Sequence, residues 1–63
     1  MTVRKVIHEY NQNTRQAFVL DTPSGFEVDL YENNNFTETR KVHEYNELYA
    51  ENVAENWVLE VIK

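Results

Sequence analysis

The last third of the chain has the hydrophobic spacing of an amphipathic helix. Apolar side chains recur there every three or four residues, which is the period of one helical face. The residues predicted to form that face are Tyr49, Ala50, Val53, Ala54 and Trp57. Residues 46–59 are therefore predicted to be helical, with Asn46 as the N-cap because its side-chain oxygen can accept a hydrogen bond from a first-turn amide. The strand-like alternation near the end leaves residues 59–63 open between helix and strand.

The first two thirds of the chain alternate between strand-like runs and clusters of turn residues. β-Branched and aromatic residues dominate the runs, and Asn, Pro and Gly separate them. The predicted strands are residues 2–10, 15–22, 26–32 and 36–43. Together with the helix they predict an α+β fold with one domain over residues 1–63. It is a four-stranded antiparallel β-meander with one C-terminal amphipathic helix packed on one face.

The turn at Pro23–Gly25 bears on the register of the central hairpin. A three-residue loop there pairs Leu20 with Val28, whereas a four-residue loop pairs Leu20 with Glu27. We expect the first register because it gathers more apolar side chains on one face. That face would carry Phe18, Leu20, Phe26, Val28 and Leu30.

A single helix covers only one face of the sheet, so the second face is expected to be open. We expect a two-residue turn at Asn33–Asn34, which would place Phe36 opposite Tyr31 on that face and Glu27 opposite Arg40. A three-residue turn would instead pair Glu27 with Lys41 and point Glu38 and Arg40 inward. A contiguous exposed apolar patch usually marks an interface. The predicted protein-binding residues are therefore Ala17, Val19, Tyr31 and Phe36.

The first strand is ambiguous, because either of two sets of its residues could face the core. One set is Val6, His8 and Tyr10, and the other is Val3 and Ile7. Whichever set is inside, the other leaves apolar side chains on the outer face.

Composition narrows the classes of function. The chain has 63 residues, a net charge of -5 and no cysteine, which excludes disulfides and thiolate metal sites. Only 6 Lys and Arg stand against 11 acidic residues, which argues against binding to nucleic acid or to an anionic membrane. Neither a membrane-spanning apolar run nor a secretory signal is visible. The expected location is cytoplasmic.

The predicted helix also carries an acidic face. Glu47, Glu51 and Glu55 follow one another at intervals of one turn. Such a run is usually a solvated surface that keeps the protein soluble. The alternative is an acidic surface that mimics DNA and occupies a nucleic-acid-binding protein.

Candidate chemistry is sparse. The tetrapeptide His-Glu-Tyr-Asn occurs at residues 8–11 and again at 43–46, and two His with two carboxylates could bind zinc if the copies lay side by side. The second copy overlaps the helix cap, however, and His and Glu point to opposite faces of an extended chain. Ser24 lies in a tight turn with no His nearby in sequence, and a single Gly cannot build a phosphate loop. We therefore expect no metal, no cofactor, no small-molecule substrate and no enzymatic activity.

The segment YENNNFTETRKV followed by NELYAENVAENWVLEVIK resembles small uncharacterised proteins encoded by marine cyanobacterial viruses (cyanophages). Those proteins carry a hairpin of the pattern Y-x-N-G-x-L-V-E-T-R and a capped helix of the pattern S-x-x-Y-A-E-D-x-A-E-N-W-V-x-G. The resemblance covers about residues 30–62. Asn46 stands at the Ser cap, Asn34 at the turn Gly and Glu60 at the Gly near the helix end. The resemblance implies a β-hairpin packed on a helix and a viral origin, and it implies no activity.

These observations favour a small non-enzymatic protein–protein interaction module, a virus-encoded modulator of a host protein. Its partner would be a host protein or a second copy of the chain in a homodimer. The alternatives are an acidic DNA-mimic inhibitor of a nucleic-acid-binding protein and an oligomeric structural accessory protein.

Overall fold

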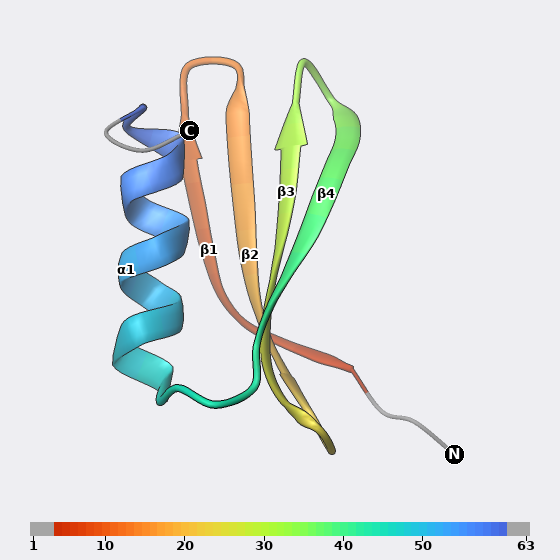
Figure 1. Ribbon diagram of the computed structural model, residues 1–63. Helices are drawn as coiled ribbons and strands as arrows, with labels where there is room; N and C mark the ends of the chain where they lie inside the picture. Colours follow the sequence, from red (N-terminus) through yellow and green to blue (C-terminus); the bar gives the residue numbers. More distant parts are fainter. Residues whose placement is uncertain (1–3, 61–63) are drawn as a thin grey trace.

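Four antiparallel strands and one helix form the structure, a computed structural model that describes residues 4–60. The elements are β1 (Lys5–Gln12), β2 (Arg15–Thr22), β3 (Gly25–Glu32), β4 (Asn35–Val42) and α1 (Glu47–Val58). The strands pair in the order β1-β2-β3-β4, and the helix lies against one face of the twisted sheet, near β1 (Figure 1). The predicted α+β meander with one C-terminal helix is confirmed. Within residues 4–60, no helix has the length and apolar character needed to span a membrane.

Asparagine enables two of the three tight hairpin turns. Asn13, Asn33 and Asn34 have φ values of 55°, 54° and 65°, in the left-handed region that Asn tolerates better than most residues. Positive φ at both central residues of the Asn33–Asn34 turn is typical of a type I′ turn, whose twist matches that of the flanking strands. The predicted two-residue turn is therefore confirmed, and Phe36 lies opposite Tyr31 as expected.

The central hairpin has a different register from the predicted one. Thr22 pairs with Gly25 across a two-residue turn, so Leu20 lies opposite Glu27 and Val19 opposite Val28. A shift of one residue sends every side chain of β2 to the other face. Ala17 and Val19 therefore face the helix, whereas Phe18 and Leu20 do not.

Local contacts and packing explain this register. The Thr22 hydroxyl donates to the Gly25 carbonyl (2.7 Å) and accepts from the Ser24 amide (3.2 Å), which closes the turn. Gly25 has φ +133°, and a Cβ on it would stand 2.7 Å from the His43 Cα, so only glycine fits there. The prediction placed Leu20 on the helix face in order to bury it, but Leu20 is also buried in its observed position on the outer face.

Each edge strand contains an irregularity. In β1 the register shifts between Val6 and His8, and in the β3–β4 pair it shifts between Leu30 and Tyr31. Beyond the second shift Glu27 pairs with Lys41, so the predicted pairing of Glu27 with Arg40 is wrong. The shift places charged side chains of β4 on the helix side, which is tolerable because β4 is an edge strand away from α1 (Figure 1).

Small side chains let the helix approach the sheet closely. Ala50 and Ala54 of α1 are fully buried, as are Ala17 and Val19 of β2. The whole core cluster is Ala17, Val19, Val28, Leu30, Val42, Ala50, Ala54, Trp57 and Val58. Tyr49 was predicted to join this face but is 42% exposed, and Val58 takes part instead.

Both ends of α1 are held by side chains. The Asn46 side chain accepts from the Tyr49 amide (2.9 Å), so the predicted N-cap is confirmed. At the other end Arg15 donates to the Trp57 carbonyl (2.9 Å) and lies 4.5 Å from the Trp57 ring centroid. This guanidinium supplies the cation that the last helical turn lacks. Glu60 follows with φ 63°, and residues 61–63 lie outside the described part of the chain.

The structure resolves the ambiguity of β1. His8 lies opposite Val19 and Tyr10 opposite Ala17, so both face the helix. Ile7, at the register shift, also packs against the core, whereas Val6 is half-exposed. Val3, which formed the second predicted set together with Ile7, lies outside the described residues.

Candidate functional site

The four predicted protein-binding residues lie on two different faces. Ala17 and Val19 have no exposed surface, because the observed register of β2 turns them under α1. Their placement on an open surface was wrong. Tyr31 and Phe36 do lie on the outer face of the sheet, where Tyr31 packs between Phe18 and Phe36.

These three rings form a row across β2, β3 and β4, which we call the aromatic row (Phe18, Tyr31 and Phe36). Phe18 and Tyr31 have ring centroids 5.5 Å apart, and Tyr31 and Phe36 are 5.6 Å apart, both in edge-on arrangements. Such geometry is favourable for aromatic quadrupoles. Phe36 is 58% exposed, so the β4 end of the row is open to solvent.

The middle of the outer face is polar. Arg4 Nη2 donates to Glu27 Oε1 at 2.9 Å and to Asp29 Oδ1 at 3.0 Å. His43 Nε2 lies 2.8 Å from Glu27 Oε2, and the Thr39 hydroxyl donates to Asp29 at 2.6 Å. The two carboxyl side chains are only 12% exposed. The outer face is therefore not a continuous apolar patch.

This network shifts the pKa of its charged members. His43, which hydrogen-bonds to the carboxylate, lowers the pKa of Glu27 below its usual value; partial burial opposes this shift, and Arg4 reinforces it. Hydrogen bonds to Asp29 and then to Glu27 raise the pKa of Arg4. Within residues 4–60, no buried side-chain nitrogen or oxygen lacks a hydrogen-bond partner. The charged groups of this network therefore compensate one another, and we interpret the network as one that stabilises the fold.

A second apolar surface lies where the helix begins, and it was not predicted from the sequence. The Tyr45 and Tyr49 rings stack with centroids 4.0 Å apart and an interplanar angle of 16°. Tyr45 is 51%, Leu48 63% and Tyr49 42% exposed. We call these three residues the helix-start patch. The sequence carried one signal for this patch, because the helical spacing places Tyr45 and Leu48 off the predicted core face.

The acidic face of α1 is partly engaged by the sheet. Glu47 Oε2 lies 2.7 Å and Glu51 Oε2 3.6 Å from His8 Nε2, and the Tyr10 hydroxyl donates to Glu51 Oε1 at 3.4 Å. Burial raises the pKa of the Tyr10 phenol, and the negative charge of Glu51 raises it further. Glu55 is exposed. Two of the three predicted acidic-face residues thus contact β1 instead of projecting freely into solvent.

The two histidines lie on opposite faces of the sheet. His8 faces α1, whereas His43 contacts Glu27 on the outer face. The arrangement that would bring both His-Glu-Tyr-Asn copies to one zinc ion is therefore not present.

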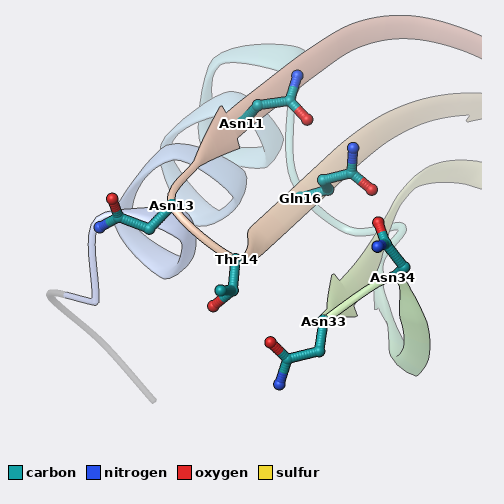
Figure 2. A pocket seen from close by; sticks show the side chains of 6 residues that line it. All are labelled: Asn11, Asn13, Thr14, Gln16, Asn33 and Asn34. Carbon is teal, nitrogen blue, oxygen red and sulfur yellow. The ribbon is translucent and has the colours of Figure 1, made fainter.

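A hollow of about 450 Å³ lies between the tips of the first and third hairpins. Figure 2 shows its lining side chains, which are Asn11, Asn13, Thr14, Gln16, Asn33 and Asn34. The Asn33 amide donates to the Thr14 carbonyl at 2.8 Å and joins the two tips. The lining has no carboxyl, imidazole or amino group that could act as a general acid or base.

The fold defines the class of the protein as a small α+β domain, an antiparallel meander covered on one face by a helix. No protein-family model, curated protein or solved structure matches the chain. Its function is therefore inferred from its own surfaces.

Proposed function

We propose that this chain is a non-enzymatic protein–protein interaction module that binds its partner through the helix-start patch. One observation carries the proposal: three large apolar side chains, each more than 40% exposed, occur within five residues of sequence at Tyr45, Leu48 and Tyr49. Exposed apolar side chains that are grouped in this way are typical of binding surfaces.

The chemistry of the patch suits a binding anchor. Tyrosine supplies a large contact area and loses little conformational entropy on binding, because it has only two side-chain torsions. The stacking of Tyr45 on Tyr49 holds both rings in place before a partner arrives. Burying these apolar side chains against a partner then supplies the main driving force for association.

Charge indicates the kind of partner. The exposed Glu44 precedes the patch in sequence, the exposed Glu47 lies between Tyr45 and Leu48, and the chain carries a net charge of -5. A complementary partner has an apolar groove bordered by Lys and Arg, which would speed encounter and exclude acidic competitors. The resemblance to cyanophage proteins leads us to propose that this partner is a host protein.

Selection from a random displayed peptide library tests the proposal while the partner itself is unidentified. We expect the wild-type chain to enrich peptides that combine apolar and basic residues. Leu48→Gln should lower the affinity for the enriched peptides about tenfold or more, as expected for a central anchor. The matched control is Leu59→Gln, the same change at an exposed leucine at the other end of α1, and it should leave binding unchanged.

Two outcomes would contradict the proposal. Either no peptide is enriched, or Leu48→Gln and Leu59→Gln weaken binding equally. Loss of binding with Glu47, Glu51 and Glu55 changed to Gln, while Leu48→Gln still binds, would favour the acidic DNA mimic instead.

The aromatic row supports a second candidate, a homodimer formed through the outer sheet face. Phe36 ends the row with more than half of its surface exposed, and a second copy could cover it. Sedimentation over a tenfold concentration range measures this directly. A dimer that Tyr31→Ala and Phe36→Ala dissociate would support it, and a monomer at all concentrations would contradict it.

A further inference from the structure

We propose that His8, Glu47 and Glu51 form a binding site for a first-row divalent transition ion, with Zn²⁺ the best fit. The site joins the middle of β1 to the first two turns of α1. This inference departs from the expectation of no metal, and it does not depend on the proposed protein-binding function.

Geometry carries the proposal. One ligand atom from each of the three side chains can be chosen so that all lie within 4.8 Å of one another. His8 Nε2 stands 2.7 Å from Glu47 Oε2 and 3.6 Å from Glu51 Oε2. Tetrahedral zinc with bonds of about 2.0–2.2 Å holds its ligand atoms about 3.3–3.6 Å apart. Small rotations of partly exposed side chains are enough to reach that arrangement.

Charge balance also favours a divalent cation. Glu47 and Glu51 lie one helical turn apart, a spacing at which like charges destabilise a helix. Within the described part of the chain, His8 is the only ion-pair partner of either carboxylate. A neutral imidazole and two carboxylates together compensate the charge of one divalent ion.

The donor set indicates which ion fits. An imidazole nitrogen with two carboxylate oxygens suits Zn²⁺ and its neighbours, whereas Mg²⁺ and Ca²⁺ prefer shells made of oxygen alone. The three side chains are each between 30% and 48% exposed, so water can complete the coordination.

Tyr10 orients one of the ligands. Its hydroxyl donates to Glu51 Oε1, whereas the opposite oxygen, Oε2, is the one that lies toward His8. Hydrogen bonds of this kind hold metal-binding carboxylates in place and contribute to affinity.

The second histidine offers a matched contrast within the same molecule. His43 Nε2 contacts Glu27 at 2.8 Å, but Arg4 already neutralises that carboxylate, and both carboxylates of the network are largely buried. Among residues 4–60, the only grouping of three potential ligand side chains is the one at His8.

Calorimetric titration of the full chain, freed of any purification tag, with zinc chloride tests the site. We expect one Zn²⁺ per chain and far weaker binding of magnesium chloride. His8→Gln, Glu47→Gln and Glu51→Gln should each weaken Zn²⁺ binding about tenfold or more, since ligands matter at least as much as the groups that orient them. His43→Gln and Glu55→Gln are the controls and should leave it unchanged.

Thermal unfolding supplies a second readout. Zn²⁺ should raise the unfolding midpoint of the wild type, because it binds only where β1 and α1 meet in the folded state, and it should not raise that of His8→Gln. The proposal is overturned if the wild type does not bind Zn²⁺ or binds Mg²⁺ equally well. It is also overturned if His43→Gln weakens Zn²⁺ binding as much as His8→Gln.

Discussion

The tetrapeptide His-Glu-Tyr-Asn occurs twice in this chain, and its two copies have different structures. Residues 8–11 lie within β1, with their His and Tyr facing the helix. Residues 43–46 form the connection between β4 and α1, where Asn46 caps the helix and Tyr45 is exposed. Identical local sequence therefore does not determine conformation here, because each copy takes the structure that its surroundings stabilise.

The two copies also contribute to different surfaces. The first brings His8 to the carboxylates of Glu47 and Glu51, between sheet and helix. The second brings His43 to Glu27 on the outer face and Tyr45 to the helix-start patch. Three pairs of substitutions and one pH series test how far these roles differ.

The largest difference is expected between the tyrosines. Tyr10 packs against the core, so Tyr10→Ala should lower the free energy of unfolding by about 2–3 kcal/mol, less than a fully buried aromatic would cost. Tyr45→Ala removes an exposed ring and should cost at most about 1 kcal/mol. Urea unfolding followed by Trp57 fluorescence measures both. Equal losses would mean that Tyr45 also belongs to the core.

The next largest difference in stability is expected between the carboxylates that contact the two histidines. Glu27→Gln leaves Arg4 and His43 without their shared partner in a largely buried network, so it should cost about 1–3 kcal/mol. Glu47→Gln acts on an exposed pair and should cost less than about 1 kcal/mol. Chemical denaturation of the two variants side by side is the measurement. A larger loss for Glu47→Gln would reverse the assignment of the structural pair.

Lowering the pH should remove the contribution of Glu27 to the stability of the fold. Because the folded pKa of Glu27 lies below the ordinary value of 4.5, its contribution to stability is full above that pH. The contribution is lost as the pH falls through the folded pKa. The destabilisation caused by Glu27→Gln, measured by denaturation at a series of pH values, should therefore be largest near neutral pH and shrink in acid. If the loss of stability caused by Glu27→Gln were the same at every pH, this would contradict the lowered pKa of Glu27.

The smallest difference concerns the asparagines. Asn46→Ala removes the helix cap and should cost about 1 kcal/mol. Asn11 is exposed in β1 and its side chain donates to the nearby Glu9, so Asn11→Ala should change stability by no more than about 0.5 kcal/mol. Thermal unfolding with circular dichroism resolves the two. A cost for Asn11→Ala as large as that of Asn46→Ala would show that the cap is not special.

Local signals in the sequence were enough to predict the elements of the fold. The helical spacing and the Asn46 cap placed α1 to within a residue at each end, and turn residues marked the hairpins. These features depend on neighbours in sequence, which is why they could be read directly.

The register of the central hairpin was not predictable in the same way. The expected pairing maximised the number of apolar side chains on one face and took no account of partners for Glu27 and Asp29. Arg4 and His43, which come from the two ends of the sheet's sequence, supply their partners instead. Because register decides which face each residue of β2 occupies, this single error moved Ala17 and Val19 from the core to the predicted binding surface.

The candidate sites depended on the same long-range information. The meeting of His8 with Glu47 and Glu51 requires knowing that His8 faces the helix, and the sequence left that choice open. The exposure of Tyr49 likewise depends on how α1 is rotated on the sheet. That rotation buries Ala50 and Ala54 completely, and the helical period alone does not specify it.

Binding through the helix-start patch is tested most directly by mapping the binding surface with nuclear magnetic resonance. An enriched library peptide is titrated into the isotope-labelled chain while the backbone amide signals are followed. If the helix-start patch binds the peptide, the largest shifts fall at residues 45–49, around the stacked tyrosines. Shifts centred instead on Tyr31 and Phe36 of the outer face, with residues 45–49 unperturbed, would contradict it.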